Sequence, residues 1–214
     1  MAVYKIYMAT NNHMKKVMFQ GDSITDADRN RSDNHFMAGY TQFVKDALDG
    51  QFEFLNYGIS GDTSRNILAR HKKEVEIVKP DFLVTLIGIN DVWRNAHNVV
   101  EEATTSEEFI NNVIEIIKQT KAIVPHVKII FLEPFLLPGS SEVYERGYDL
   151  YKKNMALLQA NVPQMVDKYI SLQDFFLNHT TKDMIYLRDG VHPSENGQKV
   201  LAENVINALK ELNK

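Results

Sequence analysis

The sequence predicts a three-layer α/β/α domain, in which helices cover both faces of a parallel sheet. Two segments, 81–88 (DFLVTLIG) and 127–134 (VKIIFLEP), are almost continuously apolar, which is typical of parallel strands covered on both faces. Between and after these segments, apolar residues recur at the spacing of an amphipathic helix. Strands that alternate with helices in this way form a parallel sheet with right-handed crossovers.

Five strands are expected, in the flavodoxin-like order 2-1-3-4-5 of a doubly wound sheet. Their carboxyl ends matter most, because ligands of such sheets bind just outside them. The expected strands are the short apolar run 17–19, which stops at Gly21, then 52–58, 81–88, 127–134 and 169–176.

Three helices show a clear apolar stripe, within residues 105–123, 151–165 and 195–212. Local signals at their ends support each of them. These signals are Thr105 with Glu108 as a capping box, Pro125 as the end of the first helix, Pro163 as a break in the second, and Ser194 as the N-cap of the third.

The length of 214 residues fits a single domain, which we place over residues 14–214. Residues 1–13 precede it as a leader, and the sequence does not decide whether this leader is ordered. The net charge is −4 without blocks of like charge, which argues against nucleic acid and anionic membranes as partners. No apolar run approaches the roughly 20 residues of a membrane span, and the N-terminus lacks a secretory signal. We therefore expect a cytoplasmic protein.

The composition also limits the chemistry. The sequence contains no cysteine, which excludes disulfides, thiol nucleophiles and thiolate metal sites. Its seven histidines form no metal-binding pattern, and no glycine-rich phosphate-binding motif occurs. We expect neither a metal nor a cofactor.

Polar residues follow the expected strand ends and mark a candidate site. Ser23 follows the first strand, either as a helix N-cap or with its hydroxyl held for chemistry. A glycine-rich turn with Gly61 follows the second strand, and Asn90 follows the third. In the last loop, Asp189 precedes His192 by three residues, so its carboxylate can hold one ring nitrogen while the other faces outward.

Four short motifs in this order resemble the SGNH, or GDSL-type, hydrolases, a family of serine esterases and lipases. The motifs are GDSITD with Ser23, GISGDTS with Gly61, GIND with Asn90, and DGVHPS with Asp189 and His192. They lie between residues 21 and 194, so the resemblance covers most of the chain. The longer strings GISGDTS, LIGINDVWR and RDGVHPS resemble most the branch that contains serine acetylxylan esterases.

The resemblance implies a role for each of these residues. Ser23 would be the nucleophile, His192 its general base and then acid, and Asp189 the group that orients the imidazole. The backbone N–H of Ser23, the backbone N–H of Gly61 and the side-chain amide of Asn90 would form the oxyanion hole.

Several of these residues also have a purely structural interpretation. Gly61 fits a turn with positive φ, and Asn90 fits an Asx-turn before Asp91. Asp22 and Asp91 are expected to accept backbone hydrogen bonds in their turns.

Two residues near the third motif are candidates for substrate binding. Trp93 is either an apolar platform for a sugar ring or packs beneath its loop. Arg94 either lines the rim of the site or is a solvated charge.

The expected function is that of a serine carboxylesterase that works through an acyl-enzyme intermediate and deacetylates acetylated carbohydrates such as xylo-oligosaccharides. Alternatives are a lysophospholipase, thioesterase or short-chain lipase of the same family, or a non-catalytic flavodoxin-like binding module. The expected partner is a small-molecule ester, without stable membrane association. The segment 135–150, which we expect to form an exposed excursion, is a candidate lid or a surface for a homo-oligomer.

Overall fold

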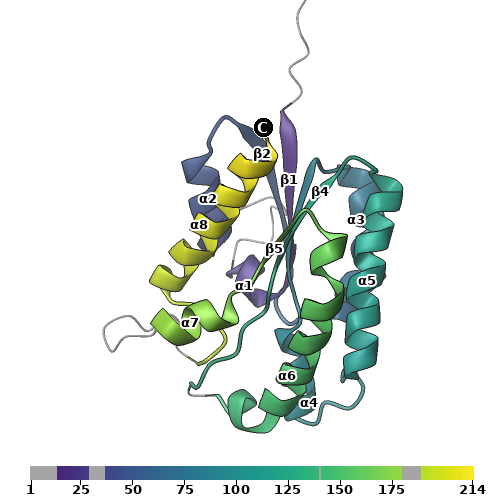
Figure 1. Cartoon of the computed structure of the whole chain (residues 1–214), viewed down its shortest axis with the longest axis vertical. Coiled ribbons are helices and arrows are strands. Elements are labelled where there is room, and N and C mark those ends of the chain that lie inside the picture. The colour runs from purple at the N-terminus through teal and green to yellow at the C-terminus, as the bar shows by residue number, and fades with distance from the viewer. Residues whose placement is uncertain (1–13, 29–36, 140, 180–188) are drawn as a thin grey trace, which may run out of the picture.

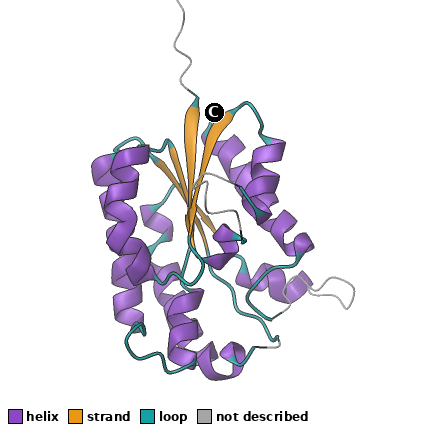
Figure 2. Ribbon diagram, turned by 180° about the vertical axis from the view of Figure 1, so that it is seen from behind, coloured by secondary structure: helices purple, strands orange, loops and turns teal. Residues whose placement is uncertain are grey.

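The computed structural model describes residues 14–28, 37–139, 141–179 and 189–214 of the chain. The leader expected at residues 1–13 lies outside the described residues. The described chain forms a five-stranded sheet between two layers of helices (Figures 1 and 2).

The sheet confirms the predicted strand order, β2-β1-β3-β4-β5, and every neighbouring pair is parallel. Its three central strands are buried along almost their whole length, which explains why the sequence is apolar there without alternation. The strands are β1 (Lys15–Gly21), β2 (Phe52–Gly58), β3 (Phe82–Leu86), β4 (Lys128–Leu132) and β5 (Lys168–Ile170).

The helices of the described residues are α1 (Ser23–Asp26), α2 (Gly39–Ala47), α3 (Ser64–Val78), α4 (Ile89–Ala96), α5 (Ser106–Ile123), α6 (Val143–Asn161), α7 (Gln173–His179) and α8 (Glu195–Leu212), and a 3₁₀ turn spans Pro163–Met165. Helices α2 and α8 pack together on one side of the sheet, and α3, α5 and α6 lie on the other (Figure 1). None of these helices is long and apolar enough to cross a membrane.

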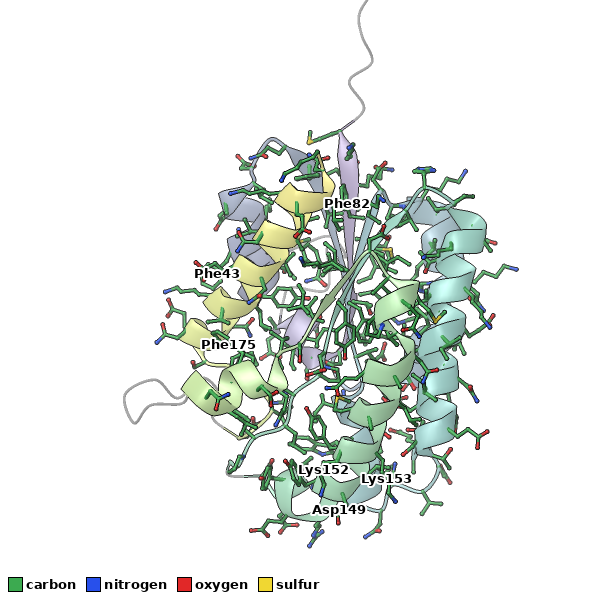
Figure 3. All side chains as sticks on the ribbon, viewed as in Figure 1. Phe43, Phe82, Asp149, Lys152, Lys153 and Phe175 are labelled. Carbon is green, nitrogen blue, oxygen red and sulfur yellow. The ribbon has the colours of Figure 1, made fainter. Side chains whose placement is uncertain are left out.

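Side chains fill the space between the layers (Figure 3). The Phe82 ring of β3 meets the Phe52 ring of β2 edge to face, with 5.6 Å between the ring centroids. The labelled Asp149, Lys152 and Lys153 belong to α6 and are exposed (Figure 3). Apolar residues therefore face the sheet while charged residues face outward, which is the pattern of an amphipathic helix.

The expected helix ends are mostly confirmed. The side chains of Thr105 and Ser194 cap α5 and α8, α5 ends at Ile123, and α6 ends before Pro163. The capping box is only half correct, because the Glu108 carboxylate accepts a hydrogen bond from Arg65 Nε at 2.7 Å.

The expected strand 169–176 is wrong in its second half. Strand β5 ends at Ile170, and α7 begins at Gln173. Leu172 and Phe176 are both buried, and the Phe176 N–H donates to the Leu172 carbonyl. Their spacing of four residues places both side chains on one helix face, so these apolar residues serve a helix.

The exposed excursion expected at 135–150 is wrong at its apolar start and in its helical second half. Phe135, Leu136 and Leu137 are 0%, 0% and 3% exposed, and α6 begins at Val143. The Phe135 ring packs on the Phe176 ring of α7 with 4.6 Å between centroids. The apolar start of this segment is therefore part of the core, whereas Pro138, Gly139 and Glu142 after it are exposed.

Candidate active site

The nucleophile candidate Ser23 is the first residue of α1 and does not cap it. Asp22 is the N-cap, because its Oδ1 accepts the backbone N–H of Ile24 at 3.0 Å. The Ser23 hydroxyl instead lies 2.8 Å from the ring nitrogen Nε2 of His192. The cap interpretation of Ser23 is therefore wrong, and its hydroxyl remains available for chemistry.

The loop before α8 holds the imidazole through Asp189. Its Oδ2 lies 2.7 Å from His192 Nδ1, and its Oδ1 accepts the backbone N–H groups of Val191 and His192 at 2.9 and 2.7 Å. Gly190 adopts φ +86°, a conformation that favours glycine. This tight turn brings the carboxylate back to the ring, as the three-residue spacing predicts.

The segment after β4 forms hydrogen bonds with this loop. The Leu137 N–H donates to the Gly190 carbonyl at 2.8 Å, and the Ser141 hydroxyl donates to the Asp189 carbonyl at 2.8 Å. A Cβ at Gly139 would overlap the Asp189 backbone. The buried 135–137 segment and the residues after it thus fix the position of the loop that carries Asp189 and His192.

The hydrogen bonds within this group set its pKa values. Burial raises the pKa of Asp189, but hydrogen bonds from the His192 ring and two backbone N–H groups outweigh it and lower the pKa to about 2. The hydrogen bond with Asp189 raises the pKa of His192 above its usual value. Asp189 is therefore ionised at neutral pH and favours a positive charge on the imidazole.

The two other predicted donors lie at the ends of the strands beside β1. Gly21 pairs with Gly58 of β2 and with Leu86 of β3, so Ser23, Gly61 and Asn90 follow three adjacent strand ends. Within the described part of the chain, no hydrogen-bond acceptor is assigned to the Ser23 or Gly61 backbone N–H. These two groups are thus available to a ligand.

A hydrogen bond fixes the Asn90 side chain relative to the loop that carries Gly61. Gly61 has φ +90°, as the turn interpretation predicts, and the Asn90 side-chain amide donates to the Asp62 carbonyl at 3.0 Å. Asn90 belongs to the first turn of α4, so the Asx-turn interpretation is wrong. An amide nitrogen has two N–H groups, which leaves one for a ligand beside Gly61.

A serine hydroxyl on an imidazole that is held by a carboxylate can attack a carbonyl carbon. Backbone and amide donors beside it can stabilise the oxyanion that forms. The described residues contain no group of three or more His, Cys, Asp or Glu side chains that could hold a metal ion.

Comparison with known proteins identifies the family. The model of the GDSL-like Lipase/Acylhydrolase family matches residues 19–200. This chain belongs to that family. An acetylxylan esterase of Geobacillus stearothermophilus is 30% identical to it over 204 residues, which cover 88% of this chain and 90% of that esterase. The protein is a hydrolase that acts on ester bonds.

Solved structures of the same family superpose on this GDSL-type hydrolase. A GDSL-like lipase from Parabacteroides merdae is 27% identical, with a TM-score of 0.81 over 91% of this chain and 94% of that one. Axe2, an acetylxylan esterase from Geobacillus stearothermophilus, is 27% identical, with a TM-score of 0.74 over 90% and 93% of the two chains. Three further Axe2 structures carry alanine in place of a serine, an aspartate and a histidine, and each is described as a catalytic mutant.

In this GDSL-type hydrolase Asp91 accepts a backbone N–H, as the sequence predicts, but from Ser64 at the start of α3 and not within its own turn. Its Oδ2 accepts the Ser64 N–H at 2.9 Å, and its Oδ1 accepts the hydroxyls of Ser64 and Thr104 at 2.7 and 2.8 Å. Burial raises the pKa of Asp91. The carboxylate joins the starts of α3 and α4, and so fixes Asn90 relative to the Gly61 loop.

The two candidates for substrate binding both lie on α4, and both contact neighbours of the site. The Trp93 ring meets the His192 ring at 6.4 Å between centroids, at an angle of 62°, and stacks on His97 at 5.3 Å. Arg94 donates from Nη2 to the Gly61 carbonyl at 3.1 Å, and its Nε pairs with Glu102 at 2.7 Å. Arg94 is therefore not a solvated charge.

Sequence reasoning missed the residues that hold the Gly61 loop. Asp26 stands in the first motif, GDSITD, but only its structure reveals that it bonds Ser60, 34 residues later. Arg70 of α3 similarly donates from Nε to the Asp62 carboxylate at 2.9 Å. Complete burial of the Asp26 carboxylate indicates its structural role. Burial of a single acidic residue cannot be inferred from the sequence.

In the wild type, the buried Asp22 carboxyl is expected to lower the free energy of unfolding as pH rises. Replacing Asp22 with asparagine should remove this loss. Burial raises the pKa of Asp22 from 3.8 to about 7, an effect opposed by the charge of His192 and reinforced by Asp91 and Asp62. Between pH 4 and 7 the unfolded chain loses this proton while the folded protein keeps it, so stability falls as pH rises. The loss amounts to about 4 kcal/mol above pH 7. Urea unfolding of both proteins across this range measures the difference.

Asp46→Asn is the matched control, because this carboxylate is exposed on α2 and loses little hydration on folding. The Asp22→Asn variant should gain stability relative to the wild type as pH rises from 4 to 7.5, whereas the Asp46→Asn variant should follow the wild type. Parallel pH curves for all three proteins would contradict the buried-carboxyl explanation.

Proposed function

We propose that this hydrolase is a serine carboxylesterase that works through an acyl-enzyme intermediate and removes acetyl groups from carbohydrates. The observation that carries the mechanism is the 2.8 Å contact between Ser23 Oγ and His192 Nε2, together with the 2.7 Å contact between His192 Nδ1 and Asp189. An aliphatic hydroxyl is a weak nucleophile and needs such a base beside it.

In the acylation step, Ser23 Oγ attacks the ester carbonyl carbon while its proton passes to His192 Nε2. The carbonyl oxygen becomes an oxyanion that the N–H groups of Ser23, Gly61 and Asn90 stabilise. His192 then gives the proton to the alcohol oxygen as the C–O bond of the ester breaks. The alcohol leaves, and the acyl group remains on Ser23.

In the deacylation step, a water molecule attacks the acyl-enzyme and gives a proton to His192. The second tetrahedral intermediate uses the same oxyanion donors, and its collapse returns the proton to Ser23 Oγ as the carboxylic acid leaves. Asp189 stays ionised throughout, consistent with its pKa of about 2. Its charge stabilises the imidazolium that forms in both steps.

Support for an acetylated carbohydrate comes from the relatives. Axe2 is described as an acetyl-xylooligosaccharide esterase, and the aspartate and histidine of its catalytic mutants are three residues apart. Asp189 and His192 have the same spacing. The alcohol part of the ester leaves next to His192, so Trp93 beside this ring is suited to contact a sugar.

An acetyl preference predicts a steep fall in kcat/KM along p-nitrophenyl esters from acetyl to octanoyl. Each methylene that a small acyl pocket excludes costs roughly 10- to 200-fold, so exclusion of only two of the added methylenes already predicts a loss of at least about 100-fold. Initial rates at matched ester concentrations measure the series. A flat or rising series would reject the preference and favour a short-chain lipase.

Acetylated xylosides should then be compared with a lysophospholipid and an acyl thioester. We expect acetate release from the xylosides at the highest kcat/KM, with Ser23→Ala as the inactive control. Faster turnover of the lysophospholipid or the thioester would assign the enzyme to another activity of the family.

A further inference from the structure

The loop between β2 and α3 carries Gly61, and α1 holds it on one side. Asp26, the last residue of α1, is fully buried. Its Oδ2 accepts both the backbone N–H of Ser60 at 3.1 Å and the Ser60 hydroxyl at 2.6 Å. The residue just before Gly61 is therefore tied to the helix that begins with Ser23.

Arg94 of α4 holds the same loop on its other side. Its Nη2 donates to the Gly61 carbonyl at 3.1 Å, and the Glu102 carboxylate forms an ion pair with the guanidinium, 2.7 Å from Nε, although Nε itself makes no hydrogen bond within the described residues. A Cβ at Gly61 would lie only 3.1 Å from Nη2. The absence of a side chain at Gly61 thus lets the arginine approach the backbone directly.

We propose that Arg94 is a positioning residue of the oxyanion hole, and that Asp26 is its counterpart across Gly61. This inference rests on the proposed function. The peptide that carries the Gly61 N–H lies between the two held groups, the Ser60 N–H and the Gly61 carbonyl. Helix α1 also begins with Ser23, and α4 also carries Asn90. The two contacts therefore fix one oxyanion donor relative to the other two.

Such fixing has a large effect on rate because oxyanion donors act only when they are already aimed at the developing charge. A displacement of about 1 Å can cost roughly 100-fold in rate. Gly61 has the backbone freedom of a glycine in a positive-φ turn, so its N–H direction depends on its neighbours. The contact between Arg70 and the Asp62 carboxylate does not involve Arg94, and keeps the loop folded when Arg94 is replaced.

The test compares Arg94→Met with Lys128→Met. Lys128 also forms an ion pair, with Asp167 at 3.0 Å, but it lies at the amino end of β4, whereas the site lies at the carboxyl ends of the strands. With p-nitrophenyl acetate we expect Arg94→Met to lower kcat by about 10- to 100-fold with KM within about threefold. Lys128→Met should keep kcat within about threefold of the wild type.

Two further readouts separate positioning from a general loss of structure. The acid limb of the pH–rate profile should not move in Arg94→Met, because the contacts of His192 with Asp189 and Ser23 are unchanged. Arg94→Lys should recover part of the lost kcat, since an ammonium can still donate to the Gly61 carbonyl. If Arg94→Met fails to fold, Glu102→Gln provides the second variant, with an expected loss in kcat of about 2- to 10-fold.

The inference is overturned if Arg94→Met matches Lys128→Met in kcat, or if its loss lies in KM alone, which would indicate substrate binding. Ser23→Ala is measured in the same assay. An active Ser23→Ala variant would overturn the proposed function and this inference with it. An inactive Ser23→Ala variant beside a normal Arg94→Met variant would overturn the positioning role alone.

Discussion

The Ser23→Ala variant is expected to lose at least about three orders of magnitude in kcat while it keeps its fold. In the proposed mechanism this side chain supplies the atom that attacks the ester, and removal of a serine nucleophile typically leaves only the contribution of binding and the oxyanion donors. The lost hydroxyl contacts His192 at 2.8 Å in an exposed position, so its removal should change stability little. Initial rates with p-nitrophenyl acetate and thermal unfolding measure the two properties.

A fluorophosphonate provides an independent measurement of the same residue. The reagent should attach to Ser23 of the wild type, and mass spectrometry of the digested protein should locate the adduct there. His192→Ala should react far more slowly, because the hydroxyl then lacks its base. An adduct on a different serine, or full activity of Ser23→Ala, would show that another residue attacks the ester.

The sheet could be predicted because its strands are buried on both faces. Strand β3 is buried at each of its five positions, and β4 at four of five, so the sequence there is simply apolar. The motif residues then follow three neighbouring strand ends, and the doubly wound order places these ends together. Burial is expressed locally, as apolar runs, and the strand order follows from the doubly wound topology that the alternating elements predict.

Among the helices that the apolar stripes did not predict, α2 and α3 share one physical reason. Helix α3 packs against the sheet with Ile67 and Val75, but also with His71, which is fully buried. Its ring nitrogens lie 2.8 Å from Gln20 Oε1 and 2.8 Å from Thr120 Oγ1. A polar residue that finds such partners is buried as readily as an apolar one, so the apolar stripe of α3 is interrupted. The short helix α2 likewise buries Thr41 beside Tyr40 and Val44.

The candidate catalytic residues and the residues that hold the Gly61 loop differ in how far apart in the sequence their contacting partners lie. Asp189 and His192 are three residues apart, so the turn between them can be inferred from their spacing. Asp26 and Ser60 are separated by 34 residues, and Arg94 and Gly61 by 33. The first contact depends on the pairing of β1 with β2 through Gly21 and Gly58, and the second also depends on the pairing of β1 with β3 through Gly21 and Leu86. Residues that act through another residue's backbone leave no local pattern in the sequence.

Replacing Asp189 with asparagine is expected to lower kcat by roughly 10³- to 10⁴-fold. Asparagine can still accept the two backbone N–H groups of the loop at its carbonyl oxygen, but it presents an amide N–H to His192 Nδ1. The ring proton then moves to Nε2, which faces Ser23 at 2.8 Å, and this nitrogen can no longer accept the serine proton. The loss should therefore appear in kcat with thermal stability close to that of the wild type.

The pH dependence of activity separates this change in the His192 tautomer from a general disturbance of the loop. His192 must be neutral to act as a base, so activity rises as pH increases through its pKa. In the wild type the hydrogen bond with Asp189 raises that pKa, which places the acid limb above the usual value for histidine. Without the carboxylate, the residual activity should show an acid limb at lower pH. The pH–rate profiles of both proteins measure the shift, with the exposed Asp149→Asn variant as control. An unshifted limb, or a loss below about tenfold, would mean that Asp189 does not orient the base, since a carboxylate 2.7 Å from the ring affects both its pKa and its tautomer.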